Sequence, residues 1–161
     1  MAGSTAKKVL IRRFDREPLT GFVNPLTFLQ PQGVELLSPD GDFALVPYGE
    51  IKVVCFVRDF EPVDNETERK LFASRPKMDG LWVRMHLRDG EVMDGILSNN
   101  LLHLVPEGFT VTPPDPNSNN QRLFVPKPAL TLMQVVGVVG SPIRQRKKPK
   151  PPLREQPSLF D

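Results

Sequence analysis

Short apolar runs alternate with turns along most of this chain. The runs are rich in valine, isoleucine, leucine and phenylalanine, and they are separated by proline, glycine and aspartate. Runs of this kind predict β-strands, and the separating residues favour tight turns. The expected strands are Val9–Phe14, Leu19–Asn24, Gly33–Leu37, Phe43–Val46, Ile51–Val57, Leu81–Leu87, Val92–Ser98, Phe109–Thr112, Arg122–Val125 and Leu130–Val139.

Two of these runs indicate how the strands are buried. In Leu81–Leu87, the apolar Val83, Met85 and Leu87 alternate with polar side chains, as in a strand with one buried face. Ile51–Val57 is instead apolar at almost every position. That composition predicts a strand that is covered on both faces.

The strand pattern occurs twice. Val9–Asn24 and Val83–Ser98 align at a constant offset, which matches Gly21 with Gly95. A repeat of this length predicts a duplicated structural unit. In the first copy the alternation slips by one position near Arg13, so we expect a one-residue β-bulge there.

The repeat divides the chain into four parts. We expect a first barrel over residues 7–60, a short helical connector over 61–79, a second barrel over 80–140 and a disordered tail over 141–161. In the connector, Asn65 is followed three residues later by Glu68, which is a helix-capping pattern. The tail is rich in proline and basic residues, as is typical of an extended, solvated segment.

One stretch of the second copy resembles a known motif. LRDGEVMDGIL, residues 87–97, has a turn glycine, a bend glycine and then an aliphatic residue, like the first half of the Sm motif. FVRDF at 56–60, and RPKMDGLWVR followed by TPPD and FVP, resemble an uncharacterised family of bacterial Sm-like domains. The resemblance implies an all-β fold of two tandem Sm-like or SH3-like small barrels. Gly21 and Gly95 are then structural bend glycines, where a side chain would obstruct the curl of the strand.

The resemblance also concerns partners. Sm-like strands often pair edge to edge in rings, so an oligomer formed by strand-edge pairing is expected unless the two copies pair internally. RNA-binding Sm proteins carry an aspartate and a Met-Asn pair after the bend glycine, and an Arg-Gly pair before the fifth strand. The corresponding segments here are 98–101, and 48–50 or 127–129, and they lack those residues.

The charge of the chain is unevenly distributed. Of 21 basic and 19 acidic residues, six and two lie from Arg144 onward, so this end carries +4 and the rest carries −2. The expected barrels therefore lack the basic character of a dedicated nucleic-acid-binding domain. With Cys55 as the single cysteine, no intrachain disulfide can form. The chain shows no signal peptide or long apolar run, so we expect a cytoplasmic protein without a membrane partner.

Enzyme signatures are weak, so we expect no catalytic residues, no metal site and no cofactor. His86 and His103 are the only histidines, which is few for a metal site. The acidic pairs Asp15 with Glu17 and Asp89 with Glu91 could serve acid–base chemistry. They sit at predicted hairpin turns, where aspartate is favoured for backbone hydrogen bonding. Cys55 lies in the most apolar strand and is interpreted as a small core residue.

Basic residues suggest two places for nucleic acid. Arg12, Arg84, His86 and Arg88 could form a strip on the first strands, although ordinary solvated strand faces explain them better. The tail holds a denser cluster that could attract nucleic acid through counterion release. Its residues are Arg144, Arg146, Lys147, Lys148 and Lys150.

The last residues form a candidate docking peptide. Gln156-Pro157-Ser158-Leu159-Phe160 resembles the bacterial sliding-clamp-binding peptide, with Pro157 in place of the usual aliphatic residue. Adjacent apolar anchors on a polar tail commonly fill a pocket of a partner protein. The alternative is that Leu159 and Phe160 fold back onto a groove of their own chain.

These patterns favour a non-enzymatic binding or adaptor protein over an enzyme. The leading hypothesis is that the tail docks on the bacterial DNA sliding clamp through Gln156, Ser158, Leu159 and Phe160. The alternative is an Sm-like module that binds RNA or single-stranded nucleic acid.

Overall fold

The computed structural model describes residues 6–60, 69–115 and 119–140, and within them the chain is built from β-strands and short 3-10 turns. The first half holds β1 (Lys7–Arg13), β2 (Leu19–Val23), β3 (Leu29–Gln30), β4 (Gly33–Leu37), β5 (Phe43–Pro47) and β6 (Ile51–Val57). The second half holds β7 (Gly80–Leu87), β8 (Val92–Leu97), β9 (Gly108–Thr112), β10 (Asn120–Pro126) and β11 (Leu130–Val139). The 3-10 turns are η2 (Tyr48–Glu50), η3 (Leu101–His103) and η4 (Lys127–Ala129).

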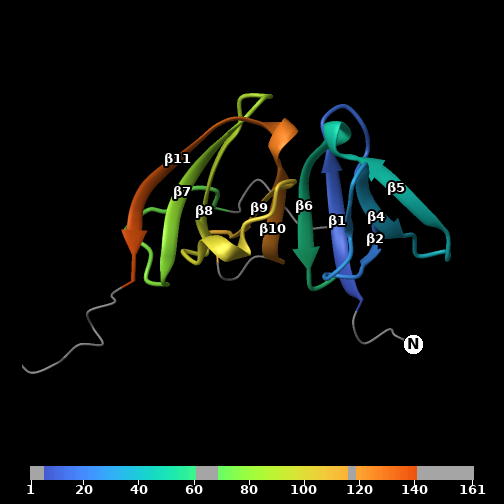
Figure 1. Cartoon of the computed structure of the whole chain (residues 1–161), viewed down its shortest axis with the longest axis horizontal. Coiled ribbons are helices and arrows are strands. Elements are labelled where there is room, and N and C mark those ends of the chain that lie inside the picture. Colours follow the sequence, from blue (N-terminus) through green and yellow to red (C-terminus); the bar gives the residue numbers. More distant parts are fainter. Residues whose placement is uncertain (1–5, 61–68, 116–118, 141–161) are drawn as a thin grey trace, which may run out of the picture.

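The strands form one open antiparallel sheet of eleven strands, so the expected all-β class is confirmed (Figure 1). The order is β11-β7-β8-β9-β10-β6-β1-β2-β4-β3, and β5 pairs with β4. Each expected strand is present, with ends that differ by no more than about two residues. The two-residue β3 was not expected, because the sequence around it reads as a loop punctuated by proline.

The two halves repeat the same strand arrangement. The order β5-β4-β2-β1-β6 in the first half corresponds to β10-β9-β8-β7-β11 in the second. The register agrees as well, because Val9 pairs with Gly21 in the first half and Val83 pairs with Gly95 in the second. The expected bulge is also present, as a register shift between Arg12 and Arg13 where β1 pairs with β6.

The halves are not two separate barrels. β6 pairs directly with β10, with Cys55 opposite Leu123 and Val54 opposite Phe124, so a single sheet runs through both halves. The reason lies in the two central strands, which are apolar on both faces. Val54 and Phe124 belong to the first-half core, and Cys55 and Leu123 belong to the second-half core. Alternate residues of β6 and β10 therefore cover two cores, and this explains why Ile51–Val57 is apolar at every position but Lys52.

The expected helical connector is not supported. Residues 69–79 contain no helix, and the capping pattern of Asn65 and Glu68 lies outside the described residues. This part of the connector lies instead against β8, since the backbone N–H of Asp94 donates to Lys70 O at 2.7 Å. The side chain of Phe72 packs edge-on against Trp82, with ring centroids 5.8 Å apart. Contacts to the sheet thus replace helical hydrogen bonds.

The described helical turns are all short. None of them has the length and apolar character of a membrane-spanning helix.

Candidate functional site

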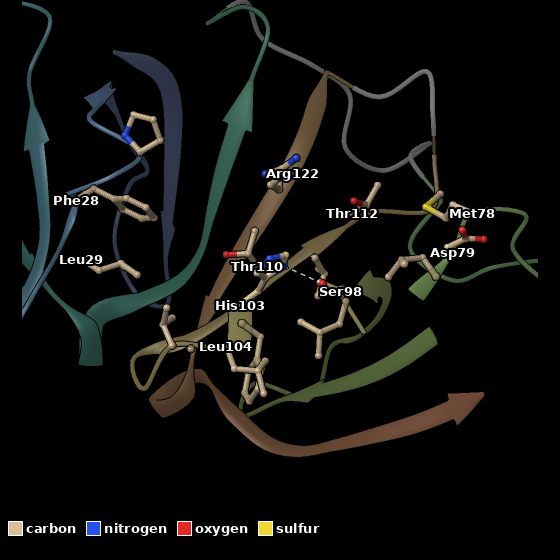
Figure 2. A pocket seen from close by; sticks show the side chains of 17 residues that line it. Phe28, Leu29, Met78, Asp79, Ser98, His103, Leu104, Thr110, Thr112 and Arg122 are labelled. Carbon is tan, nitrogen blue, oxygen red and sulfur yellow. Dashed lines mark hydrogen bonds between the residues drawn. The ribbon is translucent and has the colours of Figure 1, made fainter. Parts of the chain in front are cut away.

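A groove of about 720 Å³ lies where the two halves of the sheet meet (Figure 2). We call it the inter-repeat groove. The first half contributes Pro25, Phe28 and Leu29, and the connector contributes Met78 and Asp79. The second half contributes most of the lining, including Ser98, His103, Leu104, Phe109, Thr110, Thr112 and Arg122.

A tight turn after β2 forms the first-half wall of the groove. The side chain of Asn24 accepts a hydrogen bond from Leu26 N at 2.9 Å, and its carbonyl accepts one from Phe28 N at 2.9 Å. This local pairing is the usual role of asparagine in a turn. It holds Phe28 inward, where its ring meets the rings of Phe56 and Phe124 edge-on, at centroid distances of 5.6 and 5.8 Å. The wall is therefore a fixed aromatic surface.

The facing rim is held by a hydrogen-bond network around His103. Asn100 Oδ1 accepts from Leu102 N at 3.1 Å, so its Nδ2 is the atom that faces His103 Nε2 at 3.2 Å. Because Nδ2 can only donate, Nε2 must accept, and the proton of the neutral ring lies on Nδ1. Nδ1 then donates to Ser98 Oγ at 3.0 Å.

That tautomer decides what the serine and histidine can do. A general base must offer a lone pair to the serine hydroxyl. Here His103 presents a proton to Ser98 Oγ, which also accepts from Asn100 N at 3.1 Å. In this arrangement the network of Ser98, Asn100 and His103 shapes the rim of the groove.

The floor of the groove comes from β9 and β10. Gly108 is required at its position, because a Cβ atom there would lie 2.3 Å from Val125 O. Thr110 and Arg122 are exposed on these strands. A second depression of about 520 Å³ shares Phe28, Thr110 and Arg122 with the groove and extends it towards Lys7 and Gln121. The combined surface offers phenylalanine rings, hydroxyl and amide groups, and two cations.

The acidic pairs lie at hairpin turns, as the sequence predicted, but the two turns differ. In the second half, Asp89 Oδ1 accepts from Glu91 N at 3.0 Å, which is the backbone role expected of aspartate. The same two carboxylates hold Lys52 of β6, each with an oxygen 2.6 Å from its Nζ. In the first half, Asp15 and Glu17 are exposed. The second pair therefore ties one half of the chain to the other.

Partial burial and ion pairing shift the pKa values of the residues that link Lys52 to this turn. Burial alone would raise the pKa of Glu91, but Lys52 and Lys70 hold that pKa below its usual value. Burial alone would lower the pKa of Lys52, but hydrogen bonds to Asp89 and Glu91 raise it above its usual value. Lys52 and Glu91 are therefore charged at neutral pH, and with Asp89 and Lys70 they form an ion-pair network.

The basic residues of the first strands are largely engaged by other groups. Arg84 binds the carboxylate of Asp94, and Arg88 stacks over the ring of Phe14 at 3.9 Å. Arg88 Nη2 also donates to Gly49 O at 2.9 Å, so it links the two halves. His86 Nε2 is buried without a hydrogen-bond partner among the described residues. Arg84 and Arg88, two of the four residues of the expected strip, are therefore engaged within the protein.

Asp94 is a central polar residue that the sequence reasoning missed. Its side chain is fully buried, and its carboxylate accepts from Arg84 Nε at 2.7 Å and Arg84 Nη2 at 3.0 Å. The carboxylate also accepts hydrogen bonds from Trp82 Nε1 at 3.1 Å and from Phe72 N at 3.0 Å. Burial alone would raise the pKa of Asp94, but these donors hold it below the usual value. The sequence contains one signal for this role: Asp94 is an acidic residue inside an apolar strand, directly before the bend glycine Gly95.

The two bend glycines lie where neighbouring chain segments approach closely. A Cβ atom at Gly21 would lie 2.5 Å from Leu37 O, and one at Gly95 would lie 2.6 Å from Val111 Cγ2. Contacts of that length are not tolerated, so each site requires glycine.

The tail sites lie outside the described residues. These are the basic cluster of Arg144, Arg146, Lys147, Lys148 and Lys150, and the peptide residues Gln156, Ser158, Leu159 and Phe160. In the part of the chain that is described, no group of three or more histidine, cysteine, aspartate or glutamate side chains is arranged to hold a metal ion.

Comparisons with known proteins identify a family. Neither the curated proteins nor the solved structures give a match to this chain. A family model does match, over residues 5–137, and its description is "Family of unknown function (DUF6982)". Because this match covers most of the chain, including the whole sheet but for the end of β11, the protein belongs to the DUF6982 family.

Proposed function

We propose that this protein is a non-enzymatic adaptor whose C-terminal peptide docks on the bacterial DNA sliding clamp. The observation that carries the proposal is the terminal sequence Gln156-Pro157-Ser158-Leu159-Phe160. Two adjacent apolar side chains at the end of a polar segment suit insertion into a pocket of a partner. β11 is an outermost strand of the sheet and ends at Val139, so the peptide is separated from the sheet by a spacer of about 16 residues.

The basic cluster between the sheet and the peptide has a role in this proposal. Arg144, Arg146, Lys147, Lys148 and Lys150 would attract the DNA that a clamp encircles, through the release of condensed counterions. This attraction weakens steeply as salt concentration rises, whereas apolar anchoring of Leu159 and Phe160 does not. The two contributions can therefore be separated by a salt titration.

The experiment measures binding of the full chain to purified clamp, for example by calorimetry. Leu159→Ala with Phe160→Ala should abolish binding, because both anchors are lost. Leu153→Ala is the matched control, since it removes a leucine from the same tail outside the peptide and should bind as the unaltered chain does. Binding that is absent in the unaltered chain, or that survives loss of both anchors, refutes the proposal.

A second candidate function, binding of single-stranded nucleic acid, is supported by the inter-repeat groove. Its Phe109 offers a ring for base stacking, and Arg122 and Lys7 offer cations for phosphates. Oligonucleotide affinity should then survive deletion of residues 141–161 and fall on Arg122→Gln. Arg16→Gln is the control, because Arg16 is an exposed arginine that does not line the groove. Loss of all binding on deletion of the tail would assign nucleic-acid affinity to the basic cluster instead.

We also infer that each half of the sheet is an Sm-like unit. The support is the repeated strand order and the close-packed glycine in the second strand of each half. Within the cytoplasmic adaptor proposed here, the two units form a rigid body that carries the tail.

A further inference from the structure

The repeat places β4 and β5 of the first half where β9 and β10 stand in the second. Glu35 pairs with Leu45 across β4 and β5. Thr110 pairs with Phe124 across β9 and β10. Both pairs lie two positions from a glycine–proline pair at one end of the two strands, so Leu45 and Phe124 occupy equivalent positions.

The face that carries Phe124 is covered by the other half of the chain. The side chain of Phe124 points away from the second-half core and is part of the first-half core. It is fully buried, and its ring meets that of Phe28 edge-on at a centroid distance of 5.8 Å. In the second half, this face of the strand pair is therefore a docking surface for another structural unit.

The equivalent face of β4 and β5 carries exposed apolar side chains. Phe43 is 70% exposed and Leu45 is 46% exposed, while Val34 and Val46 of the same strands fill the first-half core. A groove of about 530 Å³ lies on this face, and it is lined by Phe43, Leu45, Glu35 and the residues of the β3–β4 turn. We call it the hairpin groove. Large exposed apolar side chains with polar neighbours are typical of a binding surface.

The charge around the hairpin groove indicates the kind of partner. Residues 17–51 include five acidic residues and no lysine, arginine or histidine. Glu35 lies in the groove, and Asp40 and Asp42 lie in the turn that leads into Phe43. None of these three carboxylates forms an ion pair with a residue that the structure describes. The surface therefore attracts cations and repels phosphate groups.

We propose that the hairpin groove binds a segment of a partner protein in which a lysine or arginine stands between apolar side chains. The cation pairs with Glu35, and its apolar neighbours pack against Phe43 and Leu45. This site is separate from the C-terminal peptide, so it gives the adaptor a second partner and does not depend on clamp binding.

Two segments of the chain itself fit the groove less well. The turn with Phe28, which covers Phe124 inside the chain, carries no basic residue, so a second copy docking through that turn would leave Glu35 unpaired. The basic cluster at 144–150 supplies cations but no apolar side chain for Phe43 and Leu45. The combination of exposed rings and carboxylates favours a segment that carries both kinds of side chain.

The test measures binding of a labelled octapeptide, in which lysine alternates with leucine, to the full chain by fluorescence anisotropy. Phe43→Ser and Glu35→Gln should each weaken binding about tenfold, because each removes one of the two kinds of contact. Leu26→Ser and Glu17→Gln are the matched controls, since both residues are exposed and lie outside the groove. These controls should bind as the unaltered chain does. Circular dichroism checks that all variants fold.

Peptide variants test the stated chemistry. Alanine in place of leucine, or glutamate in place of lysine, should weaken binding about tenfold or more, and Glu35→Lys should then prefer the glutamate peptide. The proposal is overturned if the unaltered chain does not bind the lysine–leucine peptide, if the lysine–alanine peptide binds equally well, or if the controls weaken binding as much as Phe43→Ser does. Self-association of the full chain that Phe43→Ser abolishes, measured by analytical ultracentrifugation, would also overturn it, because a second copy would then occupy the groove.

Discussion

The buried carboxylate of Asp94 should be a main determinant of stability in the second half of the sheet. Asp94→Ala removes an acceptor that receives four hydrogen bonds, from Arg84 Nε and Nη2, Trp82 Nε1 and Phe72 N. It therefore removes the side-chain hydrogen bond that Phe72 of the connector makes to β8 and leaves a cation without its counter-charge.

The magnitude follows from the exposure of each donor. The Arg84 side chain is 35% exposed, so water compensates for part of its loss. The N–H groups of Phe72 and Trp82 belong to half-buried residues and lose their acceptor, and an orphaned buried donor costs about 1–3 kcal/mol. The sum is about 3–5 kcal/mol, as for other buried ion pairs that lose one partner. This is a large share of the roughly 5–15 kcal/mol that holds a typical domain together.

The assay is denaturant unfolding followed by circular dichroism and by fluorescence. Trp82 is the only tryptophan and touches the altered site, so fluorescence reports the connector while circular dichroism reports the sheet. Thr20→Ala is the matched control. Thr20 pairs with Leu10 in β1 as Asp94 pairs with Arg84 in β7, so it occupies the same place in the first half.

We expect the control to lose less than about 1 kcal/mol. The reasoning is refuted if Asp94→Ala lowers the free energy of unfolding by no more than Thr20→Ala does. It is also refuted if fluorescence of the folded variant matches that of the unaltered protein, because Phe72 would then still pack against Trp82.

Three further outcomes are expected. Gly95→Ala should lower the unfolding free energy by about 1–3 kcal/mol through overpacking. Gly49→Ala should be nearly neutral, because the space around a Cβ atom at Gly49 is open. Thermal unfolding of the two variants compares them. Glu91 and Asp94 have folded-state pKa values below their usual ones, so their stabilisation is complete above about pH 4–5 and should disappear as the pH falls through those lowered values. A flat pH dependence of unfolding below pH 5 would contradict this. Lys52→Met should cost about 1 kcal/mol and weaken that acid dependence, since it removes one of the two cations that Glu91 binds.

Much of the fold was accessible from local sequence. Alternation of apolar and polar residues is a property of a few neighbouring positions, so it located the strands, and it also located the bulge near Arg13. The repeat identified Gly21 and Gly95 as equivalent positions. The doubly apolar Ile51–Val57 correctly indicated a strand with two buried faces, although it did not say what covers each face.

The partner of each strand was decided only by the tertiary structure. A strand such as Ile51–Val57 can end a closed barrel or pair with a strand of the other half. The second outcome depends on Leu123 and Phe124, which lie far away in the sequence and meet this strand only in the folded chain. The same holds for Asp94, whose four donors come from two separate segments, β7 and the connector, and for the groove between the halves. Local patterns determine which residues form strands and which faces are apolar. Pairing, burial and the surfaces left open depend on contacts between distant segments, and no local pattern contains them.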